Sequence, residues 1–319
     1  GMVMATDYIL FVHGVNTRQA HEQRTYADPL FERLQASTLD SDRHLQKIAF
    51  YWGDLNIEIE NLLLTQLQAS PVWEGLWFRN FRSQQILQFA GDAALYVSRH
   101  VGYKVVKKLK MDTLNIVADY EPGDRLHVVT HSWGTVILFD ILFATRWDEP
   151  TVPGHQEVMA IRDAIFGVSG IDADTRDRGI KLASIHTMGS PIAIFSLTDI
   201  VPGKDGASSS SGHDITPCLQ KLLEHLYVAR QHQKLPWRNY IHPADPLAYP
   251  LKQLMSGLVD GDAKYLDIQD VITREAGRFD FLTQPLNQTG LALIQGGNAH
   301  GSYWQSRQVV QEICNVIFA

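Results

Sequence analysis

Cysteine is scarce in this chain: Cys218 and Cys314 are the only two among 319 residues. They lie far apart in the sequence and form no metal-ligand spacing, so a cysteine-based metal site is not indicated. The preferred interpretation is two reduced thiols in a cytoplasmic protein, because disulfides persist mainly in oxidising compartments. A single disulfide between the two stays open as an alternative.

Long hydrophobic runs are also missing. No stretch reaches the roughly eighteen apolar residues that a membrane-spanning helix needs, so no membrane span is predicted. The first apolar segment begins near residue 7, which leaves no room for the charged and apolar regions of a secretory signal peptide. Together with the cysteine content, this predicts a cytoplasmic location.

Positive charge is in deficit, with 28 Lys and Arg against 35 Asp and Glu and a net charge of −7. Nucleic acid is therefore not an expected partner, because binding to phosphates requires a positive surface. No G-x-G-x-x-G follows a strand and no phosphate-binding lysine loop occurs, while His186, His213 and His225 show no H-x-x-x-H or H-E-x-x-H spacing. The sequence predicts no cofactor and no metal.

The composition that is present is typical of a globular enzyme, with 45% hydrophobic and 20% charged residues. A chain of 319 residues can form one α/β domain with insertions and can bury a core on both faces of a sheet. We expect a single domain over residues 2–319.

Short apolar runs alternate with helical stretches along the chain. Strands are predicted over residues 8–12, 47–52, 126–130, 182–187 and 238–242, with a helix over residues 23–36. Strands that alternate with helices predict an α/β protein with a mostly parallel sheet and helices on both faces.

The most informative motif is the segment THSWG at residues 130–134. It follows the apolar run 126–129 and opens a second apolar run at residues 136–139, which predicts a strand, a tight turn and a buried helix. Ser132 stands at the turn and Gly134 follows it, in a relaxed form of G-x-S-x-G with Thr130 at the first position. Such a segment is typical of a nucleophile elbow, in which a sharp turn holds a serine hydroxyl above the sheet.

Three other segments accompany this motif. An H-G segment, His13 and Gly14, follows the first predicted strand; Asp245 lies in a proline-punctuated turn after the strand at 238–242; and His300 lies in a loop of small residues near the end. Ser132, Asp245 and His300 follow one another along the chain in the order serine, acid, histidine. The chain therefore resembles the α/β-hydrolase superfamily, in its lipase- and esterase-like branch, from residue 8 to residue 304.

The resemblance implies a role for each of these residues. Ser132 is expected to be the nucleophile, His300 the general base and Asp245 the carboxylate that orients the imidazole. The backbone N–H groups of Trp133 and Val15 are expected to form the oxyanion hole.

Each assignment has competitors within the sequence. His13 is expected to brace the oxyanion loop and border the substrate, and Asn16 either bonds within that loop or contacts the substrate. The main rival base is His242, whereas His131 is expected to point away from the site. The rival acids are Asp199, Asp260, Asp262 and Asp280.

A helical insertion is predicted over residues 55–118, where a plain α/β core would need only one short helix. Apolar residues at helical spacing predict a helix over 83–99, and an aromatic stretch that includes Trp77 and Phe81 precedes it. The insertion either forms a lid that borders the substrate through these two side chains or packs against the sheet edge. The lysines of residues 104–110 are expected to form a solvated helix face.

The function expected from these residues is that of a serine hydrolase that cleaves a small carboxylic ester through an acyl-enzyme. The aromatic insertion and the lipase-like resemblance favour an apolar acyl group. A thioesterase or amidase with the same triad, and a catalytically silent α/β-hydrolase domain used for binding, are the alternatives. The sequence leaves the oligomeric state open.

Overall fold

The computed structural model describes residues 4–14, 25–39, 41–51, 65, 101–117, 120–166, 181–191, 216–243, 245, 248, 250–252, 264–273 and 302–319. The strands are β1 (Thr6–Val12), β2 (His44–Phe50), β3 (Arg125–His131), β4 (Lys181–Met188), β5 (Leu235–Ile241) and β6 (Leu266–Ile272). The helices are α2 (Asp28–Ala36), α6 (Tyr103–Val117), α7 (Trp133–Phe143), α8 (His155–Phe166), α9 (Thr216–Ala229) and α13 (Arg307–Ile317), with 3-10 turns at Thr145–Asp148 (η1) and Ser302–Gln305 (η6).

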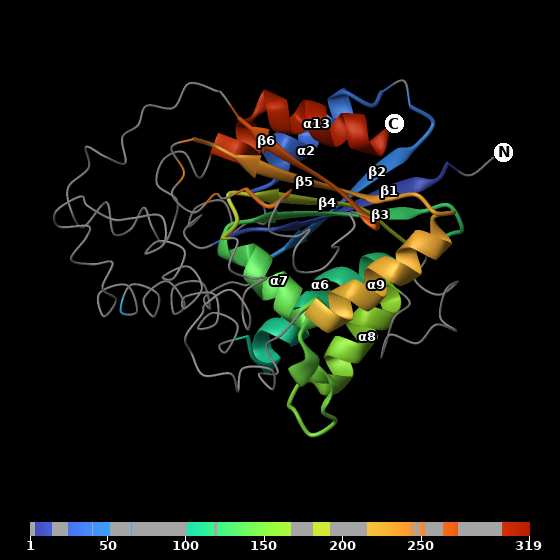
Figure 1. Cartoon of the computed structure of the whole chain (residues 1–319), viewed down its shortest axis with the longest axis vertical. Coiled ribbons are helices and arrows are strands. Elements are labelled where there is room, and N and C mark those ends of the chain that lie inside the picture. The colour runs from blue at the N-terminus through green and yellow to red at the C-terminus, as the bar shows by residue number, and fades with distance from the viewer. Residues whose placement is uncertain are drawn as a thin grey trace.

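The strands form one sheet in the order β2-β1-β3-β4-β5-β6, and every neighbouring pair is parallel. Helices cover both faces: α2 and α13 lie on one side, and α6, α7, α8 and α9 lie on the other (Figure 1). The predicted α/β class with a parallel sheet is confirmed. Because all strands run the same way, the segments that follow their carboxyl ends share one edge of the sheet, where α/β proteins bind ligands.

Two hydrophobic clusters hold the layers together. The larger one packs β-strand side chains against α6, α7, α8 and α9, and the smaller one packs the opposite face of the sheet against α2 and α13. Helix α7 lies centrally, and all eleven of its residues are buried. Its one carboxylate, Asp140, is compensated by Arg146 at 2.6 Å and by the indole N–H of Trp147 at 3.0 Å, as a buried charge requires.

Several element boundaries differ from the prediction, and β5 begins at Leu235 instead of residue 238. The helix predicted from residue 23 begins at Asp28, with Pro29 in its first turn, where a residue without an N–H donor is tolerated. Tyr26 therefore precedes the helix, and its hydroxyl lies 2.8 and 2.6 Å from the carbonyl oxygens of Phe11 and Phe50. The second strand covers His44–Phe50 instead of 47–52.

The end of the predicted insertion is a core element. Helix α6 packs against β2 and α8 and connects β2 to β3. Lys104 and Lys107 on it are exposed, as predicted, whereas Lys108 and Lys110 are half-buried and the Lys108 ammonium lies 4.8 Å from the centre of the Tyr51 ring. The predicted helix over residues 83–99 lies outside the described residues.

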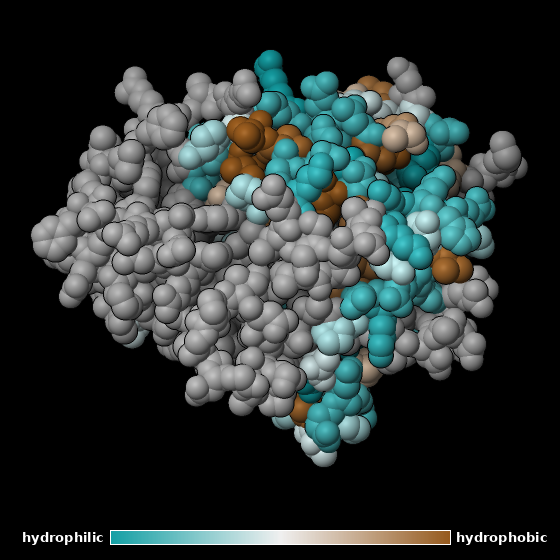
Figure 2. All heavy atoms as spheres, viewed as in Figure 1, coloured by the Kyte–Doolittle hydropathy of each residue, from teal (hydrophilic) through white to brown (hydrophobic). Residues whose placement is uncertain are grey.

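Figure 2 shows that the described surface over α9 and α13 is mainly hydrophilic in this view, with scattered hydrophobic spots. None of the helices in the described ranges is long and apolar enough to cross a bilayer. Cys314 is a free thiol, so the alternative of a disulfide with Cys218 is wrong.

A chain of buried hydrogen bonds crosses the sheet beneath α13. It joins Asp7 to His127 (2.9 Å), His127 to Ser184 (2.6 Å), Ser184 to His186 (2.9 Å) and His186 to Tyr240 (2.8 Å). We call these five residues the buried polar chain. At its first end, Arg43 and Arg125 donate to both oxygens of Asp7.

The carboxylate and the burial of the histidines set the direction of the bonds in the buried polar chain. An ionised Asp7 only accepts, so His127 donates to it from Nε2. Burial lowers the pKa of His127, and the Nδ1 of a neutral ring then accepts from the Ser184 hydroxyl. His186 then donates from Nε2 to Ser184 and accepts at Nδ1 from Tyr240. In this arrangement each neutral imidazole uses one ring nitrogen as a donor and the other as an acceptor.

Burial lowers the pKa of His186 well below its ordinary value, and the neighbouring His127 and Arg238 add to this shift. Burial also lowers the pKa of His127, against the opposing effect of Asp7. For Asp7, burial would raise the pKa, but hydrogen bonds from His127, Arg125 and Arg43 outweigh it and lower the pKa below the ordinary range.

The protein should therefore lose stability as the pH falls from 7.5 to about 5.5. In this window the unfolded chain protonates its histidines near their ordinary pKa of about 6.5, whereas the folded state keeps His127 and His186 neutral. Each histidine that is protonated only in the unfolded chain lowers the free energy of unfolding by up to about 1.4 kcal/mol per pH unit. Urea unfolding at a series of pH values measures this slope.

A His186→Gln variant is the matched control, because glutamine can hydrogen bond but does not titrate. Its free energy of unfolding should depend less steeply on pH than that of the wild-type protein. Equal slopes for the two proteins would contradict a neutral His186 in the folded state.

Candidate active site

Ser132 lies at the turn between β3 and α7 with φ 56° and ψ −134°. A positive φ places the Cβ of an L-residue against its own backbone, and the combination with this ψ lies near a region that essentially only glycine adopts. Such a conformation costs on the order of 1–3 kcal/mol and persists only where the surroundings enforce it. The predicted tight turn between a strand and a buried helix is therefore present, with a strained backbone at Ser132.

The surroundings hold the turn through backbone and side-chain bonds. The N–H of Ser132 donates to the carbonyl of Met188 at 3.0 Å, and the Ser132 carbonyl accepts from the N–H of Thr135 at 3.1 Å. The Thr135 hydroxyl donates to Thr130 at 2.7 Å and lies 2.6 Å from the hydroxyl of Ser190. Thr130, the departure from G-x-S-x-G, thus helps to join the strand to the helix.

Two glycines permit the close packing around Ser132. A Cβ on Gly134 would lie 2.1 Å from the carbonyl oxygen of His13, so helix α7 can approach the end of β1 only because residue 134 has no side chain. A Cβ on Gly14 would lie 2.6 Å from the Cβ and 3.2 Å from Oγ of Ser132. The segment after β1 thus passes directly over the serine.

The Ser132 hydroxyl is buried, and no donor or acceptor among the described residues lies within hydrogen-bond reach of Oγ. Buried polar atoms are nearly always paired, so the Oγ of Ser132 requires an explanation. Trp133, predicted to supply one oxyanion donor, is the first residue of α7. The first N–H groups of a helix favour negative charge. Val15, the second predicted donor, lies outside the described residues.

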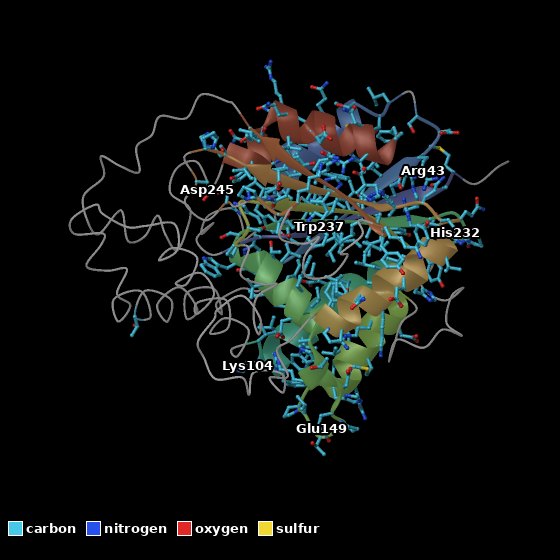
Figure 3. The ribbon with its side chains drawn as sticks, in the orientation of Figure 1. Arg43, Lys104, Glu149, His232, Trp237 and Asp245 are labelled. Carbon is cyan, nitrogen blue, oxygen red and sulfur yellow. The ribbon has the colours of Figure 1, made fainter. Side chains whose placement is uncertain are left out.

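Asp245 follows β5 at the same edge of the sheet and is 4% exposed. Figure 3 shows it at one end of the sheet, with Arg43 and His232 at the opposite end. Its Oδ2 accepts a hydrogen bond of 2.7 Å from the Tyr303 hydroxyl, and its backbone N–H donates to the carbonyl of His242 at 2.9 Å. The predicted acid is therefore a fixed, buried carboxylate at the edge where Ser132 lies.

His300 lies outside the described residues, but the segment that follows it is described. Turn η6 begins at Ser302, two residues after His300. Within this turn, the rings of Tyr303 and Trp304 lie 5.9 and 5.4 Å from the ring of His131, the neighbour of Ser132. The structure thus brings the chain after His300 to both the elbow and the acid.

The rival histidines have other surroundings. His131 packs edge-on against these two aromatic rings. His13 is fully buried, its Nδ1 lies 2.6 Å from the carbonyl oxygen of Gly14, and its ring packs on Tyr26 at 4.8 Å. His242 is buried beside Asp245, and its backbone N–H donates to Tyr303 at 2.9 Å.

A second serine, histidine and aspartate set was not foreseen from the sequence: Ser184, His127 and Asp7 of the buried polar chain. Its hydrogen-bond order is that of a catalytic triad, and its side chains are as buried as that of Ser132, so burial alone does not separate the two sets. Ser184 lies in the interior of β4, on the face that α13 covers, and not after a strand end. This set can stabilise the fold but gives a substrate no access.

Of the other predicted site residues, Asn16, Trp77 and Phe81 lie outside the described residues, as do the rival acids Asp199, Asp260, Asp262 and Asp280. Asp270 on β6, which the sequence did not single out, accepts from the backbone N–H groups of Leu251 and Lys252 at 2.8 and 3.2 Å. It fixes the chain that follows Asp245. In the described ranges, no three His, Cys, Asp or Glu side chains are placed to share a metal ion.

Compared with known proteins, the chain matches no family model and no curated protein. Any functional assignment therefore depends on the geometry of this edge of the sheet.

Gly134→Ala should lower the free energy of unfolding by about 1–3 kcal/mol, as overpacking of a tight core does. The added Cβ meets backbone atoms of His13, which cannot move without displacing the end of β1. Gly102→Ala is the matched control, because nothing lies within 4 Å of its added Cβ. Equal unfolding midpoints for the two variants would contradict the packing described for the elbow.

Proposed function

We propose that this protein is a serine hydrolase of the α/β-hydrolase type that cleaves carboxylic esters through an acyl-enzyme. The observation that supports this most directly is the backbone of Ser132, a serine held at positive φ between a central parallel strand and a buried helix. Strain of this kind is stored at functional sites, because a purely structural serine gains nothing from it. The elbow, the glycine passing over it and the buried acid all lie at one edge of the sheet.

In this mechanism the Ser132 oxygen attacks the ester carbonyl carbon while His300 takes its proton. The carbonyl oxygen becomes negative and is stabilised by the N–H groups of Trp133 and Val15. His300 then gives its proton to the departing alcohol, and an acyl group remains on Ser132. Water then attacks the acyl carbon while His300 takes its proton. The bond from that carbon to the Ser132 oxygen breaks, the acid leaves, and His300 returns the proton to Ser132. Asp245 orients the imidazole and stabilises its charged form.

A fluorophosphonate probe tests whether Ser132 is activated. Its phosphorus reacts with an activated serine oxygen, fluoride leaves, and the adduct is detected by mass spectrometry. We expect the wild-type protein to be labelled at Ser132 and the Ser132→Ala variant to stay unlabelled.

The matched control is Ser184→Ala, which removes the serine of the buried set. This variant should keep its labelling at Ser132, even if the loss of two buried hydrogen bonds lowers its stability. Labelling at Ser184, or none in the wild-type protein, would refute the assignment; the second outcome would favour a silent binding domain.

Asp245→Asn should lower kcat for p-nitrophenyl ester hydrolysis by about 10⁴-fold, because an amide no longer holds the productive imidazole tautomer. Asp267→Asn serves as the control. Asp267 is a half-exposed carboxylate on the edge strand β6 that pairs with Arg238, and its replacement should leave kcat within about twofold. Similar kcat values for the two variants would show that the acid lies elsewhere, and Asp199 would be tested next.

A further inference from the structure

Tyr303 connects the acid to the segment that bears the base. The residue is fully buried in turn η6, three residues after His300. Its hydroxyl lies 2.7 Å from Oδ2 of Asp245 and 2.9 Å from the backbone nitrogen of His242. One phenol oxygen thus contacts both ends of the turn that holds the acid.

The direction of both hydrogen bonds follows from their partners. The backbone N–H of His242 only donates, so the phenol oxygen accepts from it. The single hydroxyl proton of Tyr303 is then directed at the carboxylate, which accepts it at Oδ2. Burial raises the pKa of Tyr303 well above its ordinary value, and the charge of Asp245 raises it further. The phenol therefore stays protonated, and it is a permanent donor.

This bond constrains the carboxylate at a place where catalysis depends on orientation. Holding Oδ2 sets the plane of the Asp245 carboxyl group and, with it, the direction of Oδ1. The ring of Tyr303 also packs against His131 at 5.9 Å, beside Ser132. A single side chain in the histidine-bearing segment thereby fixes the acid and contacts the elbow.

From this geometry, we propose that Tyr303 is a positioning residue, which orients the Asp245 carboxylate for the histidine through its hydroxyl. The inference rests on the proposed serine hydrolase function. Tyr303 contacts neither substrate nor reacting atoms in this role, so its effect must pass through Asp245.

The test is Tyr303→Phe, which removes the hydroxyl and keeps the ring. We expect kcat for p-nitrophenyl acetate to fall about ten- to a hundredfold with KM nearly unchanged, since a charge-assisted bond that orients a catalytic group is lost. Rates are taken per active site titrated with the fluorophosphonate probe, so that partly unfolded protein is not counted.

The matched control is Tyr240→Phe. Tyr240 is an equally buried tyrosine, but its hydroxyl bonds to His186 in the buried polar chain and does not touch Asp245. The Tyr240→Phe variant should have a lower thermal stability but a kcat within about twofold of the wild-type value, because the hydrogen bond that it loses does not involve the acid. Equal kcat values for Tyr303→Phe and Tyr240→Phe would overturn the inference.

A double-mutant cycle separates positioning from a general structural effect. In an Asp245→Asn background, Tyr303→Phe should lower kcat by less than about twofold, because the carboxylate through which Tyr303 acts is gone. The same loss in both backgrounds would mean that the hydroxyl acts independently of Asp245 and would overturn the inference alone. A wild-type protein that shows neither hydrolysis nor labelling would overturn the proposed function together with it.

Discussion

A serine held in a backbone conformation that side chains avoid is the constraint on which the rest of this site depends. Ser132 can sit at φ 56° only because its N–H and carbonyl are bound by Met188 and Thr135. That arrangement in turn requires glycine at 134, where any Cβ would meet the chain after β1. The fold thus offsets about 1–3 kcal/mol of local strain to hold this serine at the carboxyl edge of the sheet. A helix begins directly after it, with its first N–H groups nearby.

The two serine, histidine and aspartate sets show that residue types alone do not define a hydrolase. Asp7, His127 and Ser184 are joined by short hydrogen bonds, yet they lie within strands and beneath α13. The proposed catalytic residues come from segments that follow strand ends, where a parallel sheet leaves space for a ligand. Position relative to the strand ends therefore separates a structural polar chain from a candidate active site.

Local patterns predicted the part of the structure that local forces determine. Continuous apolar runs identified five of the strands, and the small residues around Ser132 identified the elbow. Strand β6 was missed because the segment from Leu266 to Ile272 contains no long apolar run, and its apolar–polar alternation is broken at Gln269 and Asp270. The buried polar chain could not be predicted, since its partners, such as Asp7 and His127, are 120 residues apart and meet only in the folded sheet. The hydrogen bond from Tyr303 to Asp245 joins residues 58 positions apart, and the sequence could not predict it for the same reason.

The central claim is that three distant segments converge on one reacting oxygen. A crystal structure of the protein after reaction with an organophosphonate measures this most directly, because the adduct marks the reactive serine and occupies its oxyanion site. The account predicts phosphorus on Ser132, a phosphonyl oxygen facing the N–H of Trp133, and Nε2 of His300 within about 2.6–3.2 Å of Oγ. An adduct on another residue, or a His300 imidazole more than about 5 Å from Oγ, would contradict it.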